Sequence, residues 1–276
     1  MKPIFGWLSF VLVLIQSALA EPKTHPDRIV AYKETPQGEL RLHIFNPTKG
    51  EDDNRPAMVL FFGGGWNGGS PEQFYGQSRH LADRGMVAIA AEYRIKKIHC
   101  TDPRVCVMDA KSAMRWVRTN AKQLGVDPDR IGAAGGSAGG HLAAATATIE
   151  AFNEPDEDIS ISCKPQALVL FNPVIDNSEN GYGYERVKAY WQDFSPMHNL
   201  RPGTPPTILF LGTDDKLIPV DTANEYKSRM EANGDACELF LYEGQPHGFF
   251  NKEKYAETVG EMDRFLENLG WIDPAE

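Results

Sequence analysis

The sequence predicts an α/β fold with a mostly parallel, doubly wound sheet and helices on both faces. Two observations support this: strand-like and helix-like segments alternate along the chain, and from Ala57 onward several strand segments are almost continuous apolar runs. Such runs are typical of strands that are covered on both faces. The chain has 276 residues, 42% of them hydrophobic, which suits one large domain with a sizeable core.

The expected elements follow one another in a regular order. Apolar patterning predicts seven strands, at 40–45, 57–62, 87–92, 131–134, 167–172, 207–212 and 238–242. Helical spacing predicts four helices between and after them, at 109–124, 138–149, 220–233 and 253–269. In sheets of this kind, ligands bind beyond the carboxyl ends of the strands, so the loops at that edge hold the candidate site.

The first 20 residues have the pattern of a signal peptide. Lys2 supplies a positive charge, residues 4–15 form an apolar run, and the Ala-Leu-Ala at 18–20 offers a cleavage site before Glu21. The run is short for a transmembrane helix, and an uncleaved anchor is the alternative. We therefore predict a secreted or periplasmic protein with one domain over 21–276 and no membrane association after cleavage.

A glycine-rich loop follows the strand predicted at 57–62. It reads Phe62-Gly63-Gly64-Gly65-Trp66 and is called the glycine loop below. Its glycines let backbone N–H groups approach a ligand closely. Phosphate-binding loops share this property, but the chain has no GxxxxGK[ST] pattern. The loop is therefore a candidate oxyanion hole, a set of donors for a negatively charged oxygen.

The most informative motif is Gly135-Gly136-Ser137-Ala138-Gly139, which lies between a predicted strand and an alanine-rich predicted helix. The order of strand, tight turn and helix exposes a serine hydroxyl for attack on a carbonyl carbon. The small neighbours leave room for the strained turn. Ser137 is the predicted nucleophile, and the backbone N–H of Ala138 is a predicted oxyanion donor.

A serine nucleophile needs a base, and the base needs an orienting acid. In hydrolases with this turn the chain order is serine, acid, histidine. His247 lies in a loop after the last predicted strand and is the predicted base. Asp214 and Asp215 follow the strand at 207–212 and point in different directions, so only one can face the histidine. Asp176, after the preceding strand, is the further candidate.

A long connection over 174–206 is rich in aromatic residues. Long insertions at the edge that carries the site often form lids or substrate-binding loops, and ordinary aromatic packing is the alternative. From this segment and the glycine loop we predict four residues that contact substrate: Trp66, Tyr182, Tyr184 and Trp191.

Net charge and cysteine usage limit the partners. The formal charge of −10 argues against nucleic acid and anionic membranes as partners.

The four cysteines have no CxxC spacing and no histidine cluster, so we expect no metal site. In an oxidising compartment they can form disulfides; we favour a bond between Cys100 and Cys106, with buried thiols as the alternative.

These motifs resemble those of α/β-hydrolases of the carboxylesterase, hormone-sensitive-lipase-like type. The likeness is closest to secreted acetylxylan and feruloyl esterases, the BD-FAE-like branch. The supporting segments span most of the chain in a specific order, at 62–66, 109–118, 127–131, 135–140, 172–174, 212–219 and 247–249.

The resemblance implies an α/β-hydrolase fold and selects Asp215 over Asp214 as the acid. It also implies that Gly64 and Gly65 are oxyanion donors. One departure is visible: Phe62 stands where the family usually has a histidine. That position shapes the loop and takes no proton, so we expect catalysis to survive and the substrate preference to differ.

The predicted function is a serine esterase that cleaves short-acyl or carbohydrate-linked esters, such as acetyl or feruloyl esters, through an acyl-enzyme. The expected substrate is a small-molecule or polysaccharide ester, and no cofactor is expected. One alternative is a serine peptidase of the prolyl-oligopeptidase-like type, although the chain leaves little room for a propeller domain. The other is a non-catalytic binding protein with a hydrolase fold.

Overall fold

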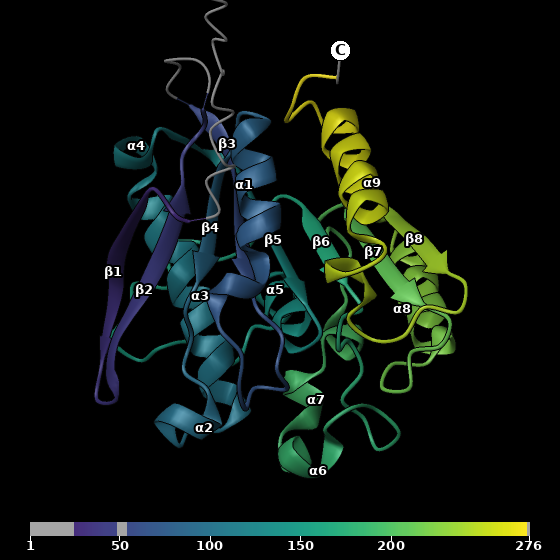
Figure 1. The fold of residues 1–276 in the computed structure, drawn as a ribbon. Helices are drawn as coiled ribbons and strands as arrows, with labels where there is room; N and C mark the ends of the chain where they lie inside the picture. Colours follow the sequence, from purple (N-terminus) through teal and green to yellow (C-terminus); the bar gives the residue numbers. More distant parts are fainter. Residues whose placement is uncertain (1–24, 49–53, 275–276) are drawn as a thin grey trace, which may run out of the picture.

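The computed structural model describes residues 25–48 and 54–274. Within them, eight strands form one sheet in the order β1-β2-β4-β3-β5-β6-β7-β8 (Figure 1). The pairs β1–β2 and β2–β4 are antiparallel, and all other pairs are parallel, which confirms the predicted fold class. The strands are β1 Arg28–Thr35, β2 Gly38–Phe45, β3 Arg55–Phe61, β4 Val87–Ala91, β5 Val126–Gly136, β6 Leu168–Phe171, β7 Thr207–Gly212 and β8 Cys237–Tyr242.

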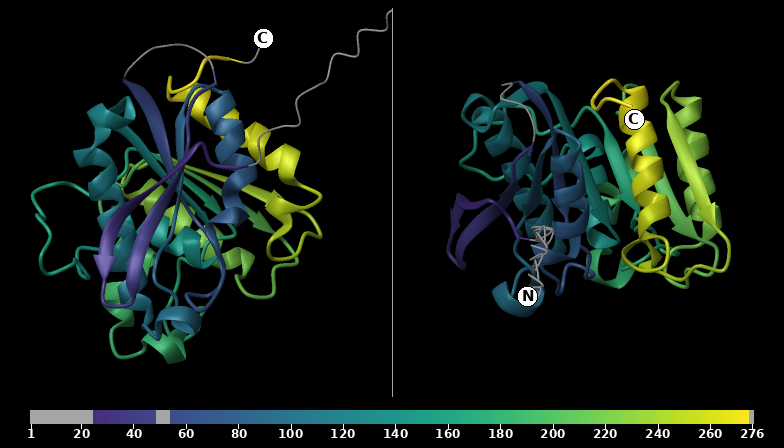
Figure 2. Two further views of the ribbon diagram at one scale, coloured as in Figure 1. Left: turned by 60° about the vertical axis from the view of Figure 1, so that its left-hand side comes forward. Right: turned by 45° about the horizontal axis from the view of Figure 1, so that its top comes forward.

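Helices cover both faces of the sheet, with α1 and α9 on one face and α3, α5 and α8 on the other (Figures 1 and 2). On the first face, Arg84, the residue directly after α1, forms an ion pair with Glu267 of α9 at 2.8 Å. The helices are α1 Tyr75–Asp83, α2 Lys96–His99, α3 Pro103–Thr119, α4 Ala121–Leu124, α5 Ala138–Thr148, α6 Tyr184–Val187, α7 Trp191–Phe194, α8 Val220–Ala232 and α9 Tyr255–Asn268.

Several elements differ from the prediction. The helix α1 and the short helices α2, α6 and α7 were not predicted, and the helix expected at 109–124 is divided at Asn120 into α3 and α4. The sequence analysis also missed β1, an edge strand whose residues, apart from the buried Tyr32, are exposed or half-buried and therefore carry little apolar signal. It also started the long helix α3 at 109 instead of Pro103. Asp102 caps the true start, because its carboxylate accepts a hydrogen bond from the backbone N–H of Arg104 at 2.9 Å, and proline favours the first helical position.

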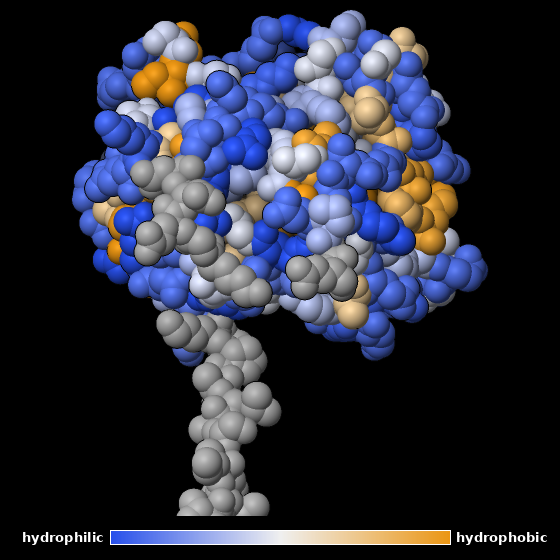
Figure 3. Space-filling view, turned by 90° about the horizontal axis from the view of Figure 1, so that it is seen from above, coloured by the Kyte–Doolittle hydropathy of each residue, from blue (hydrophilic) through white to orange (hydrophobic). Residues whose placement is uncertain are grey.

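The register of the parallel strands brings the loops of the candidate site to one edge. Phe61 at the end of β3 pairs with Gly135 near the end of β5, and Gly212 at the end of β7 pairs with Tyr242 at the end of β8. Helices α6 and α7 of the 174–206 segment lie at this edge as well, below the sheet in Figure 1. Figure 3 shows the opposite end of the molecule, whose surface is mostly hydrophilic with small separate hydrophobic patches.

The favoured disulfide between Cys100 and Cys106 is wrong. All four cysteines are free. Cys106 is buried on α3, and its thiol lies 3.1 Å from the Arg94 carbonyl as a hydrogen-bond donor, while Cys100 is exposed at the end of α2. Burial raises the pKa of the Cys106 thiol well above its usual value, so it behaves as a small core residue, which was the alternative.

The predicted signal peptide at 1–20 lies outside the described residues. Within 25–48 and 54–274, no helix combines the length and the apolar character needed to cross a membrane. The same segments hold no group of three or more His, Cys, Asp or Glu residues placed to bind a metal ion.

Gly139, in the first turn of α5, allows that helix to touch β3. A Cβ at this position would lie 2.0 Å from the Phe61 carbonyl oxygen, and that oxygen belongs to a central strand that cannot easily shift. We expect Gly139→Ala to lower the free energy of unfolding by about 3 kcal/mol. The measurement is urea denaturation followed by circular dichroism.

The matched control is Gly260→Ala. Gly260 lies on the exposed side of α9, and a Cβ there meets no atom within 4 Å. Removing a helical glycine should stabilise the protein by about 0.5–1 kcal/mol. Equal effects of the two substitutions would contradict the close contact between α5 and β3.

Candidate active site

Ser137 lies on the sharp turn between β5 and α5. Its backbone has φ 54° and ψ −120°, a conformation that costs a residue with a side chain about 1–3 kcal/mol. Backbone hydrogen bonds hold the turn: the Ser137 N–H donates to the Phe171 carbonyl at 3.0 Å, and the Ser137 carbonyl accepts from His141 at 3.0 Å and Val174 at 3.1 Å. The strained turn therefore presents the hydroxyl at the carboxyl edge of the sheet.

A chain of hydrogen bonds joins Ser137 to two other predicted residues. His247 Nε2 lies 2.9 Å from Ser137 Oγ, and His247 Nδ1 lies 2.6 Å from Asp215 Oδ2. His247 comes from the loop after β8 and Asp215 from the loop after β7, so the three meet only because the strands end at one edge. This geometry suits an imidazole whose Nδ1–H donates to the carboxylate and whose Nε2 accepts a hydrogen bond from the serine hydroxyl.

Of the three candidate acids, the structure places Asp215 against the histidine. Its carboxylate is fully buried, and Oδ1 accepts backbone hydrogen bonds from Leu217 at 2.8 Å and Ile218 at 3.0 Å, which leaves Oδ2 for His247. The carboxylate of Asp214 is 62% exposed and faces Lys216. Asp176 instead bonds the backbone N–H of Ser178.

Asn172 is a site residue that the sequence analysis did not assign. Its Oδ1 accepts a hydrogen bond from the Gly248 N–H at 3.0 Å, and its Nδ2 lies 3.4 Å from His247 Nε2. The residue is fully buried directly after β6, with an unusual φ of 34°. Asn172 therefore fixes the loop that carries the histidine. The available signal was an asparagine, a residue type that tolerates positive φ, directly after a buried strand.

The glycine loop faces Ser137 from the end of β3. Its first glycine is fixed because the Gly63 N–H donates to Oε1 of Gln73 at 2.5 Å. Gly64 has φ 136°, and a Cβ there would lie 2.1 Å from the Gly68 carbonyl oxygen, so only glycine fits. Within 25–48 and 54–274, the backbone N–H groups of Gly64, Gly65 and Ala138 have no hydrogen-bond partner. Three donors near the hydroxyl are thus available to a ligand.

Phe62 packs instead of hydrogen-bonding. Its ring stacks on Tyr93 with centroids 4.1 Å apart, and the Tyr93 hydroxyl donates to the Phe62 carbonyl at 2.6 Å. Gly69 approaches this ring so closely that a Cβ would lie 2.7 Å from it. The base of the glycine loop is therefore held by aromatic packing at the position where the resemblance led us to expect a histidine.

A cavity of about 430 Å³, the serine cavity, lies in front of these groups. Both Ser137 and His247 line it, together with the glycines of the loop, Leu217 and Phe250. Of the four predicted substrate contacts, Tyr182 lines this cavity. Tyr184 and Trp191 are not among the described residues that line this cavity.

Trp66, the fourth predicted contact, is the last residue of the glycine loop and is 1% exposed. Its ring packs edge-on against His141 and Phe194, at 5.1 Å and 5.5 Å between centroids. Burial lowers the pKa of His141 to about 3, so this second histidine near the turn is a neutral packing residue. Trp66 is therefore mainly a support for the loop.

Arg186 on α6 connects the 174–206 segment to the glycine loop. Its Nη1 donates to the Gly65 carbonyl at 2.7 Å, and its guanidinium lies 5.1 Å from the ring centroids of both Trp66 and Tyr182. No sequence motif marks this arginine, because its role depends on how the segment folds back.

Comparison with known proteins gives the family. The BD-FAE family profile matches residues 42–179, half of the chain, and the dienelactone hydrolase family profile matches 181–268. The propionate-bound structure of a thermophilic esterase from Thermogutta terrifontis is 42% identical, covers 92% of this chain and 98% of its own, and superimposes with a TM-score of 0.87.

Two curated relatives are also esterases. An acetylxylan esterase of Xylanibacter ruminicola is 29% identical over 85% of this chain and 48% of its own length. Esterase LipC of Mycobacterium tuberculosis is 29% identical over 71% of this chain and 54% of its own. The chain thus spans about half the length of these curated relatives. The predicted resemblance is confirmed: the chain belongs to the BD-FAE family of esterases with the α/β-hydrolase fold.

Proposed function

We propose that this protein is a serine esterase that cleaves carboxylic esters through an acyl-enzyme. One observation carries the proposal: Ser137 Oγ, His247 and Asp215 form a continuous hydrogen-bonded chain at 2.9 Å and 2.6 Å, facing a cavity bordered by unpaired backbone N–H groups. A nucleophile, an oriented base and oxyanion donors are the parts that acyl transfer needs.

In the proposed first step, Ser137 Oγ attacks the ester carbonyl carbon while His247 Nε2 takes the hydroxyl proton. The N–H groups of Gly64, Gly65 and Ala138 stabilise the negative oxygen of the tetrahedral intermediate. His247 then returns the proton to the alcohol oxygen, and the carbon–oxygen bond to the alcohol breaks. Asp215 holds the imidazole in the required tautomer and stabilises its charged form.

The second step reverses these roles with water. His247 takes a proton from water, and the hydroxide attacks the acyl carbon that is bonded to Ser137. Collapse of the second intermediate releases the carboxylic acid, and the proton on His247 returns to Ser137 Oγ. Ester and water are thus converted to acid and alcohol, with the enzyme unchanged.

Short-acyl or carbohydrate-linked esters are the proposed substrates. The size of the serine cavity, about 430 Å³, and the acetylxylan esterase among the relatives support this class. Propionate and butyrate are bound in structures of the Thermogutta terrifontis esterase.

An acyl-chain series tests the substrate class. We expect kcat/KM for p-nitrophenyl esters to be highest for acyl chains of two to four carbons and to fall about tenfold or more at twelve carbons, because a longer chain must leave the cavity. Acetylated xylan and methyl ferulate are measured beside the series. Turnover confined to long chains would refute the proposed class.

Export is the proposed location. The support is the charged, apolar and small-residue order of the first 20 residues and the acetylxylan esterase among the relatives. Amino-terminal sequencing of the protein recovered from outside the cytoplasm should begin at Glu21. Recovery of an intact Met1 end would point to an uncleaved anchor.

A further inference from the structure

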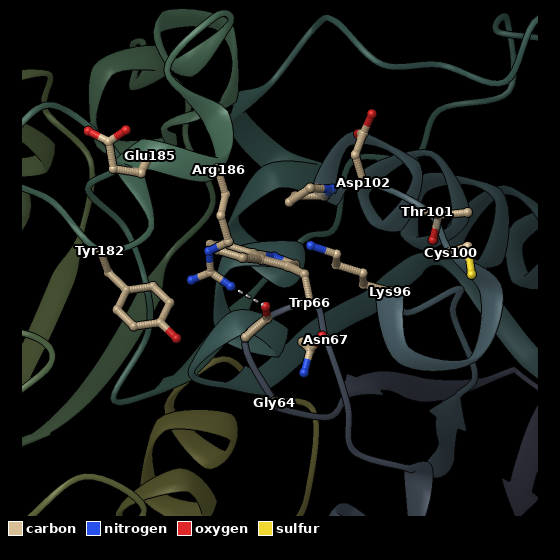
Figure 4. Close-up of a pocket in the computed structure, with 12 residues that line it drawn as sticks. Gly64, Trp66, Asn67, Lys96, Cys100, Thr101, Asp102, Tyr182, Glu185 and Arg186 are labelled. Carbon is tan, nitrogen blue, oxygen red and sulfur yellow. Dashed lines mark hydrogen bonds between the residues drawn. The ribbon is translucent and has the colours of Figure 1, made fainter.

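A second cavity lies beside the serine cavity and has a different character. Its volume is about 640 Å³, and it lies between the glycine loop, α2 and the 174–206 segment (Figure 4). Gly64, Gly65 and Tyr182 line both cavities, so the two share a wall. This space, called the cationic cavity below, therefore borders the serine cavity along these three residues.

Two positively charged side chains converge there. Figure 4 shows the Lys96 ammonium group directed toward Trp66 and Arg186. Among the described residues, no acceptor pairs with Lys96 Nζ. Arg186 uses Nη1 to bind the Gly65 carbonyl and leaves its other N–H groups without a partner in the described segments. Both side chains can thus donate hydrogen bonds to a ligand.

The two carboxylates in the lining do not cancel these charges. Asp102 is bound to Arg104, with 2.6 Å between Oδ2 and Nη2, and Glu185 is bound to Lys188 at 3.0 Å. In Figure 4 both carboxylates point away from the space between Lys96 and Arg186. The local charge at the centre of the cavity is therefore positive, on a chain whose net charge is −10.

We propose that the cationic cavity is a subsite for a carboxylate carried by the ester substrate. An arginine with free N–H groups matches the planar geometry of a carboxylate, and a lysine adds a point charge. The buried ring of Trp66 forms the floor and holds the guanidinium in place by a cation–π contact. This inference rests on the proposed esterase function and adds the substrate class: esters with a second, free acid group.

The test compares matched esters that differ only in charge. Monoethyl esters of four- to eight-carbon diacids place the carboxylate on the acyl side, and 4-acetoxyphenylacetate places it on the alcohol side. In each case the control is the neutral amide in place of the free acid. We expect at least one acid to be preferred over its amide by about tenfold in kcat/KM, at low ionic strength.

Charge variants on α2 show whether the preference comes from this cavity. Lys96→Met should reduce the preference to about threefold or less, and Lys96→Glu should abolish or reverse it. The matched control is Lys97→Met, because Lys97 is the adjacent exposed lysine and lies outside the cavity lining. Arg186 is kept intact because it also binds the glycine loop.

The results distinguish failure of the proposed subsite from failure of the proposed esterase function. Preference for an acid that is lost in Lys96→Met and kept in Lys97→Met supports the subsite, and the side that carries the acid shows which arm of the ester enters it. No preference on either side, or equal loss in both lysine variants, overturns it. Failure of the wild-type protein to cleave even the neutral esters refutes the proposed esterase function instead.

Discussion

Replacement of Ser137 by alanine is expected to lower kcat/KM for p-nitrophenyl acetate by at least about 10⁴-fold. The hydroxyl 2.9 Å from His247 Nε2 is the proposed nucleophile, and no other hydroxyl group forms a hydrogen bond with that nitrogen in the described segments. The remaining activity should come from water activated by His247 and from the oxyanion donors. The same variant should not be labelled by a fluorophosphonate probe. Near-wild-type turnover would refute the mechanism.

A control separates loss of the nucleophile from loss of the fold. Ser137→Gly also removes the hydroxyl, but glycine adopts φ 54° and ψ −120° without a steric clash. Both variants should therefore be inactive, while the glycine variant should unfold at a higher temperature than the alanine variant. An alanine variant that is as stable as the glycine variant would show that the turn is not strained.

Asp215→Asn is expected to lower kcat by about 10⁴-fold with little change in KM. Asparagine can still accept the Leu217 and Ile218 N–H groups through Oδ1, so its Nδ2 would face His247 Nδ1. Two donors would then meet, and the imidazole would adopt the wrong tautomer, with a proton on the nitrogen that must accept one. Steady-state kinetics with a short-acyl ester measures the effect.

The neighbouring aspartate provides the matched control. Asp214→Asn removes the same charge one residue away, on a side chain that is mostly exposed and faces Lys216. An exposed ion pair of this kind contributes little, so activity should stay within about twofold of the wild type. If Asp214→Asn were as damaging as Asp215→Asn, the assignment of the acid would fail.

The central part of the fold could be predicted because its signals are local and strong. The strands from β3 to β7 are buried on both faces, and their apolar runs stand out in the sequence. The edge strand β1 has no such run, since only one of its eight residues is buried. The early start of α3 depends on the Asp102 cap and Pro103, a local signal that the helical periodicity does not contain.

For the candidate site, the order of the motifs along the chain identified residues that the spacing within a single motif does not identify. The order of serine, acid and histidine led to the residues that the structure brings together. Asn172 and Arg186 act through tertiary contacts with a distant loop, which a single sequence does not show. The Cys100–Cys106 disulfide failed for a related reason: short spacing says nothing about which way a side chain points, and Cys106 points into the core.

The hydrogen bond from Arg186 to the Gly65 carbonyl has an evolutionary consequence. Insertions like the 174–206 segment are the parts of an enzyme that usually vary freely between relatives, because they lie outside the core. Here the insertion also holds the loop that carries the proposed oxyanion donors. If the loop acts as proposed, a lineage that remodels this segment to accept a new substrate changes the rate of the chemical step at the same time. Selectivity and turnover are coupled through one side chain, and divergence is expected to proceed by compensating pairs of substitutions on α6 and the glycine loop.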